Sequence, residues 1–150
     1  MSESEELLRA THASLKRLLR RLDGLDALDD DAMKLCTGSG WTLAATLVHL
    51  AFYDDWVATR WRRRLAEGRF QDLPDDITEL ANAAGERGWH GVPAHEAKMM
   101  SRDAAMGVAT LLDGLPGDVL EDAVFTGRPA MIDRSRHWDP HLEEIERALS

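Results

Sequence analysis

The sequence predicts an all-α protein with one domain spanning residues 1–150, and three observations lead to this prediction. The chain has 150 residues, enough for one hydrophobic core rather than two. Apolar residues recur at every third or fourth position through several long segments, which is the spacing of an amphipathic helix. No segment shows the alternation of apolar and polar residues that is typical of a half-buried strand. Glycine, proline and aspartate separate the periodic segments, so we expect four helices joined by turns and loops.

The first helix is predicted over roughly residues 3–22. Ser2 and Glu5 have the spacing of a capping box, which places the start of the helix directly after Ser2. Gly24 is expected to end the helix, because glycine is favoured just past the last turn. The acidic and glycine-rich stretch that follows, up to Gly40, is expected to be loop.

The second helix is the most apolar of the four. Thr42 is expected to cap it, and it should run to about Glu67, with Gly68 just past its end. Two adjoining stripes at helical spacing predict its buried side: Leu43, Leu47, Leu50, Val57, Trp61 and Leu65 in one, and Ala45, His49, Tyr53 and Trp56 in the other.

A long connection separates the second helix from the last two. Residues 68–92 are the least periodic part of the chain and predict a crossover with room for one short helix. A third helix is predicted from Pro93 to about Asp113, and a fourth from near Pro129 to the carboxyl terminus. Pro140 is expected either to kink the fourth helix or to mark its first turn. The crossover allows the second and third helices of such a bundle to run parallel.

The charge balance and the single cysteine exclude several classes of protein. Eighteen lysine and arginine residues against 27 aspartate and glutamate residues give a net charge of −9, which disfavours binding to nucleic acid or to an anionic membrane. Cys36 is the only cysteine, so no disulfide can form within the chain, and a reducing cytoplasm is the expected location. The amino terminus has no signal-peptide pattern, and no apolar run approaches the roughly 18 residues that suggest a membrane span.

Three of the six histidines form a candidate metal site. His137 and His141 are four residues apart, so on a helix both side chains project from one face and can reach the same ion. His49 is the candidate third ligand, because it lies in the most apolar helix, where an unpaired polar group is costly. The alternative for His49 is a buried side chain that is hydrogen-bonded to a carbonyl.

The segment Gly40–Leu50, which contains Gly-Trp-Thr and His49-Leu50, resembles the start of the second helix in the DinB-like superfamily. That superfamily includes the amino-terminal domains of mycothiol-dependent maleylpyruvate isomerases and related bacterial thiol transferases. The His137-x-x-x-His141 pattern resembles its second motif. The resemblance implies a DinB-like four-helix bundle, arranged up-down-down-up, that holds a divalent metal ion through His49, His137 and His141.

The implied metal is zinc, nickel, iron or manganese, since three imidazoles select weakly among these ions. Three protein ligands leave coordination positions open, which is typical of catalytic sites. We therefore expect a metal-dependent thiol S-transferase or isomerase that uses a low-molecular-weight thiol, such as mycothiol, on a small electrophile. The alternatives are a non-catalytic metal-binding or dimerisation module, and a toxin-resistance protein that sequesters or hydrolyses its target. A homodimer is an expected assembly, as it is common in the family.

Several other side chains are candidates for supporting roles. Metal-bound imidazoles are usually oriented by a carboxylate that accepts from the other ring nitrogen. The candidates near the histidines in sequence are Asp54, Asp133, Asp139 and Glu144. Glu144 fits the alternative of a solvated helix face better. Arg60 or Arg64 could meet an anionic thiol or substrate. Asn82 is expected to cap a short helix in the crossover. Cys36 has only Lys34 as a nearby base and is expected to be inert.

Overall fold

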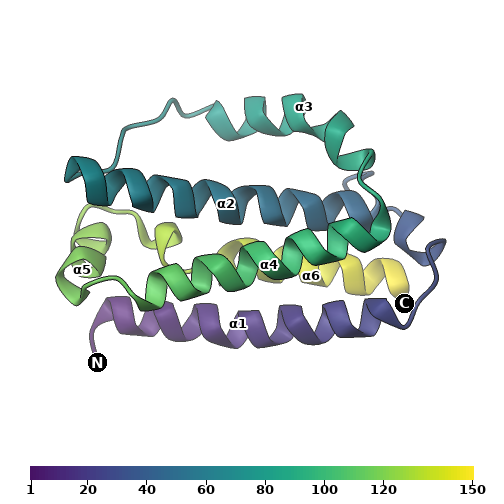
Figure 1. The fold of residues 1–150 in the computed structure, drawn as a ribbon, viewed down its shortest axis with the longest axis horizontal. Helices are drawn as coiled ribbons and strands as arrows, with labels where there is room; N and C mark the ends of the chain where they lie inside the picture. Colours follow the sequence, from purple (N-terminus) through teal and green to yellow (C-terminus); the bar gives the residue numbers. More distant parts are fainter.

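The computed structural model describes residues 1–150 and confirms the all-α prediction, with six α-helices and no β-strand (Figure 1). The α-helices are α1 (Glu3–Asp26), α2 (Leu43–Glu67), α3 (Ile77–His90), α4 (Ala94–Asp113), α5 (Gly117–Phe125) and α6 (Ser135–Leu149), and two 3-10 turns are η1 (Ala32–Lys34) and η2 (Pro129–Met131). None of the helices combines the length and the apolar character that crossing a membrane requires.

Four helices, α1, α2, α4 and α6, run along the long axis of the molecule and lie beside one another in Figure 1. Following the colours along the chain, α1 and α6 run in one direction and α2 and α4 in the opposite one. The helix α3 lies along the outer side of α2 and connects it to the start of α4. The parallel course of α2 and α4 is therefore made possible by the crossover between them.

The first two helices begin where the sequence predicts. Both hydrogen bonds of the capping box between Ser2 and Glu5 are present, and Thr42 Oγ1 accepts a hydrogen bond from the third residue of its helix at 3.0 Å. Gly68 ends α2 in the left-handed conformation, with φ of +84°. The predicted end of α1 at residue 22 is wrong, because the helix continues through Gly24 to Asp26. Burial of Leu25, which is fully enclosed, stabilises the extra turn.

Two helices differ from the prediction because proline and glycine did not interrupt them. The crossover holds the 14-residue α3, longer than the one short helix expected. The nine-residue α5 was not predicted, since Pro116 and Gly117 were expected to be loop. Pro116 instead precedes the first helical residue, where proline is well tolerated, and burial of Leu120 and Ala123 holds the short helix against the bundle.

The last helix begins at Ser135 rather than near Pro129, because a tight turn precedes it. Thr11 of α1 fixes this turn: its Oγ1 donates to the carbonyl of Ile132 at 2.7 Å and accepts from the backbone N–H of Arg134 at 2.9 Å. Asp133 then accepts from the backbone N–H of Ser135 at 3.1 Å and so satisfies an otherwise free donor of the first turn. A contact with α1, distant in sequence, therefore sets where α6 starts.

The core lies between the four long helices and contains two fully buried tryptophans. Trp61 donates its indole N–H to the carbonyl of Met131 at 2.7 Å, and Trp138 donates to Asp54. The predicted apolar side of α2 is buried as expected except at Trp56, which is half-buried, and at its end, where Leu65 is exposed. The bond of Trp61 joins α2 to the turn η2 and that of Trp138 joins α6 to α2, so the two indole groups fix the position of α6 and the turn before it against α2.

Candidate metal centre

The structure brings together the three histidines that the sequence singled out, and this cluster could hold a metal ion. One ligand atom from each of His49, His137 and His141 lies within 4.8 Å of the others. The ring centroids are 4.8 Å apart for His49 with either partner and 5.0 Å apart for His137 and His141. The Nε2 atoms of His49 and His137 are 2.8 Å apart. Ligand nitrogens about 2 Å from one ion and at right angles to each other would be about 3 Å apart, so this spacing suits shared coordination.

The helix α6 supplies two of the three imidazoles from successive turns. It continues from Ser135 to Leu149 with Pro140 in its interior, so the proline does not mark the first turn. Proline has no N–H to donate within the helix, but the solvent-exposed position of Pro140 lets the free carbonyl reach water. The rings of His137 and His141 remain 5.0 Å apart, so Pro140 does not splay the pair.

His49 is enclosed by aromatic rings. Its side chain is only 4% exposed, and its ring centroid lies 4.7 Å from Trp41, 5.0 Å from Tyr53 and 5.2 Å from Trp89. The alternative of a hydrogen bond to a carbonyl is wrong, because Nε2 faces His137 and the buried Nδ1 has no partner. Burying an imidazole whose Nδ1 has no hydrogen-bond partner costs free energy. The position of His49 therefore indicates a role for the Nε2 lone pair, such as binding a metal ion.

Burial keeps two of the three imidazoles neutral. It lowers the pKa of His49 to about 3, with a further contribution from His141, and it lowers the pKa of His137 to about 2, together with the charge of Arg134. Both rings are therefore uncharged at neutral pH. Neutral imidazole is the form that binds metal ions, so no proton has to leave a charged ring before a metal ion binds.

His141 is oriented by a carboxylate, as the sequence suggested. Its Nδ1 lies 3.3 Å from Oε2 of Glu144, which is half-buried one turn further along α6. When Nδ1 donates to Glu144, the lone pair of His141 is at Nε2, on the other side of the ring. A carboxylate behind a ligating imidazole is the usual arrangement around protein-bound metals, and this observation fits His141 as a ligand.

His137 is oriented by Arg134. Nη2 of Arg134 lies 3.3 Å from Nδ1 of His137 and also 3.0 Å from Oδ1 of Asp54. Because a guanidinium only donates, Nδ1 of His137 accepts, and its proton lies on Nε2 toward His49. To bind a metal ion at Nε2, His137 would have to carry that proton on Nδ1 instead, and Arg134 would give up the hydrogen bond that it donates there.

Asp54 therefore affects His137 through Arg134. It is 1% exposed, pairs with Arg134 and accepts from the indole N–H of Trp138 at 2.9 Å. Burial raises the pKa of Asp54 to about 6, although the charge of Arg134 opposes the shift. The other two aspartates expected here lie elsewhere: Asp133 caps α6, and Asp139 accepts from Ser14 of α1 at 2.6 Å.

A cavity of about 470 Å³ borders the three histidines. Tyr53 forms part of its wall, and its hydroxyl lies 2.7 Å from Oδ1 of Asn82. Asn82 does not cap a helix as predicted but lies inside α3 and faces this cavity. Tyr53 was predicted only as part of the buried side of α2, and Arg134 was not predicted at this site. Tyr53 could have been found from its position one helical turn after His49, whereas no sequence signal marks Arg134.

The remaining histidines and the cysteine lie away from this centre. His90 and His95 are exposed, and His12 pairs with Asp113 at 2.7 Å on the surface. Cys36 is exposed, and its Sγ has only a weak 4.0 Å contact with the carbonyl of Lys34. These residues supply controls for the experiments below.

Comparison of the chain with protein-family models, curated proteins and solved structures finds no match. The resemblance to the DinB-like superfamily thus stays a prediction that depends on the two sequence motifs.

Proposed function

We propose that the protein is a DinB-like four-helix bundle, arranged up-down-down-up, that binds one divalent metal ion through His49, His137 and His141. It acts with a low-molecular-weight thiol, such as mycothiol, as a metal-dependent thiol S-transferase or isomerase on a small electrophile. The observation that carries the proposal is the placement of the three imidazoles beside a cavity of about 470 Å³, which is large enough for a small molecule.

The ligand set supports a metal with open coordination positions. Three imidazoles bind zinc, nickel, iron or manganese, and an arrangement of three protein ligands is typical of catalytic rather than structural zinc. A metal held there would lower the pKa of a bound thiol and keep it as the nucleophilic thiolate.

The chain's own residues have separate roles around that chemistry. Glu144 orients His141, and the pair of Asp54 and Arg134 orients His137. Trp41 and Trp89 exclude water from the enclosed side of His49. The cavity side is left for the thiol and the electrophile, where the hydroxyl of Tyr53 is held by Asn82.

The first test is elemental analysis of protein purified without a nickel column or chelator. We expect about one metal ion per chain in the wild type and a loss of metal in both His49→Ala and His141→Ala. The exposed His90 provides a matched control, since His90→Ala should keep the full metal content. Less than about a tenth of an equivalent in the wild type, not restored by added zinc, nickel or manganese, would contradict the proposed metal site.

The second test asks whether the metal accepts a thiol. In cobalt-substituted protein, 2-mercaptoethanol should change the visible spectrum, and the change should be absent in His49→Ala. A non-catalytic metal-binding or dimerisation module would show bound metal without this change and a large fall in melting temperature on chelation. A toxin-resistance protein that hydrolyses its target would bind metal and retain a metal-bound water, but would not respond to the thiol.

The carboxylate behind His141 allows a finer test. Glu144→Gln should weaken metal binding about 10- to 100-fold, because it replaces the charged acceptor behind the ring with a neutral and weaker one. The neighbouring Glu143 is exposed and has no contact with a histidine, so Glu143→Gln changes charge equally and should leave metal affinity unchanged. Competition with a chromogenic chelator measures both variants. Equal losses would indicate that only surface charge matters.

A further inference from the structure

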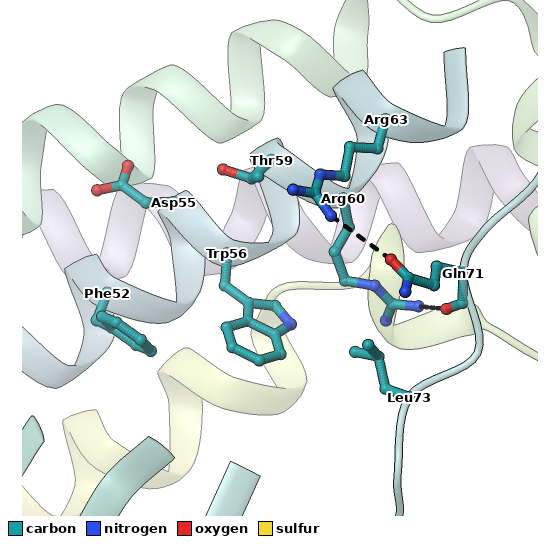
Figure 2. Close-up of a pocket in the computed structure, with 8 residues that line it drawn as sticks. All are labelled: Phe52, Asp55, Trp56, Thr59, Arg60, Arg63, Gln71 and Leu73. Atoms are coloured by element: carbon teal, nitrogen blue, oxygen red, sulfur yellow. Dashed lines mark hydrogen bonds between the residues drawn. The ribbon is translucent and has the colours of Figure 1, made fainter. Parts of the chain in front are cut away.

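A second cavity, of about 530 Å³, shares Trp56 with the cavity that borders the histidines, and Figure 2 shows the residues that line it. It is formed by the outer face of α2 and the segment that follows this helix. Phe52 and Trp56 form its apolar side, Leu73 lies across from them, and Arg60 and Arg63 project into one end beside Gln71. The cavity therefore combines an apolar wall with two guanidinium groups.

Arg60 is the only partly buried arginine that forms no ion pair. Its Nη2 donates to the carbonyl of Gln71 at 3.0 Å, and its Nη1 lies 3.6 Å from the sulfur of Met131. All other arginines that are buried or half-buried pair with a carboxylate, in a chain with a net charge of −9: Arg17, Arg21, Arg64, Arg102, Arg128 and Arg134. Arg64 was predicted as an alternative to Arg60 for binding an anionic thiol or substrate, but its guanidinium pairs with Asp122 at 3.2 Å.

The missing partner has an energetic consequence. Burial lowers the pKa of Arg60 and the nearby charge of Arg128 lowers it further, while the charge of Asp72, which pairs with Arg128, opposes the shift only in part. A partly buried cation without a carboxylate is less stable than one that is paired, so an anion in the cavity would gain by meeting it. Uncompensated charge beside a cavity is typical of a binding site rather than of a structural ion pair.

The second guanidinium, that of Arg63, lies at the same end of the cavity as Arg60. Arg63 is exposed, forms no ion pair and has only a 3.5 Å contact with Oε1 of Gln71. Asp55 lies at the opposite end of the cavity (Figure 2). An anionic group is thus attracted to the end formed by the arginines and repelled from the other end. Between the two ends, the indole of Trp56 offers a flat apolar surface.

We propose that this cavity binds a small aromatic monocarboxylate, with its carboxylate on Arg60 and Arg63 and its ring against Trp56. The planar guanidinium suits a carboxylate, with which it forms two parallel hydrogen bonds. The apolar wall favours an aromatic group over an inorganic anion. Asp55 disfavours a second negative charge at the far end of the ligand.

The position of this cavity also indicates the substrate class of the histidine centre, and this step rests on the proposed function. Trp56 lines both cavities, and Arg60 contacts Met131, which lines the cavity of the histidines. A carboxylate held by Arg60 therefore lies near the cavity that His137 lines. The electrophile is then an aromatic or similarly apolar carboxylate that reaches past Trp56 toward the metal.

The test is titration of the full chain with 2-naphthoate, followed by calorimetry and by amide chemical shifts. Metal-free and metal-loaded protein are both used. We expect binding to both forms, with the largest shifts around Trp56, and binding at least about tenfold weaker in Arg60→Gln, since a charge-assisted hydrogen bond is lost. Arg63→Gln, at an exposed position that should not affect folding, should weaken binding about threefold. The neutral 2-naphthamide should bind far more weakly than 2-naphthoate.

Arg62 provides the matched control, because it is exposed on the same helix and does not line this cavity. Arg62→Gln changes the net charge equally and should leave affinity within about twofold of the wild type. Equal affinity of wild type and both cavity variants, or of 2-naphthoate and 2-naphthamide, would overturn the proposal. Loss of binding in His49→Ala but not in Arg60→Gln would also overturn it, by placing the anion at the histidines. Because metal-free protein is included, a failure of the metal site leaves this result interpretable.

Discussion

Trp56 lines two cavities that each have an arginine in the wall, and the buried Arg134 and the half-buried Arg60 differ in their partners. Arg134, beside the histidines, pairs with Asp54, which is itself 1% exposed and bonded to Trp138. Arg60, in the second cavity, forms no ion pair and contacts a carbonyl, a thioether and the ring of Phe70 instead. The same residue type is therefore neutralised at one cavity and left with its charge available at the other.

The difference separates a structural role from a binding role. A neutralised buried charge orients its neighbours and contributes little attraction for a ligand, so the histidine cavity depends on neutral imidazoles. An uncompensated charge at a cavity attracts an anion, so the second cavity depends on Arg60. The two cavities are expected to respond differently to mutation and to pH.

The largest expected effect is the loss of the carboxylate that neutralises Arg134. Asp54→Asn leaves the guanidinium buried without a counter-charge and should reduce the free energy of unfolding by about 3 kcal/mol or more. Arg60→Gln removes a charge that has no carboxylate partner and should cost less than about 1 kcal/mol. Urea denaturation of metal-free protein measures both. Similar costs for the two variants would remove the distinction between the arginines.

Between pH 7 and pH 5, the pH dependence of stability should come mainly from the histidine cavity, because the carboxylates whose pKa values are lowered elsewhere titrate at lower pH. The folded-state pKa of His49 is about 3 and that of His137 about 2, against about 6.5 when unfolded. Below pH 6.5 the unfolded chain takes up protons that the folded chain does not, so the stability from the neutral rings is complete above pH 6.5 and lost as pH falls. Each ring should account for about 2 kcal/mol of loss between pH 7 and pH 5.

A variant isolates that contribution from the aspartates. Asp54 acts in the opposite direction, because its pKa is raised to about 6 and the folded chain gains its proton first. In metal-free protein, His137→Gln should therefore reduce the difference in unfolding free energy between pH 7 and pH 5 by about 2 kcal/mol. Arg60→Gln should leave that difference unchanged. A difference that His137→Gln does not alter would show that the ring is protonated in the folded chain.

The smallest expected effect concerns the aromatic rings that enclose His49. A Cβ atom at Gly85 would lie 2.5 Å from Cζ2 of Trp89, so Gly85→Ala should displace that ring from His49 at a cost of about 1–2 kcal/mol. Gly88 lies in the same helix with no atom within 4 Å of its added Cβ, so Gly88→Ala should stabilise by about 0.5–1 kcal/mol. Thermal unfolding compares the two, and a destabilising Gly88→Ala would contradict the assigned cause.

The sequence predicted the helices whose ends carry local signals. The capping box at Ser2, the cap at Thr42 and the left-handed Gly68 depend on neighbours within a few residues, and all three occur as expected. It failed where a tertiary contact overrides the local signal. Leu25 extends α1 past Gly24, and Thr11 delays the start of α6 by binding the turn before it.

The candidate site divides in the same way. Helical spacing determined that His137 and His141 share a face, and the apolar pattern determined that His49 is buried, because both depend on a period of 3.6 residues within one helix. The meeting of α2 with α6, the pairing of Asp54 with Arg134 and the unpaired state of Arg60 were decided by the tertiary structure alone. These contacts join residues up to 88 positions apart, and which partners meet depends on how the helices pack rather than on any local preference.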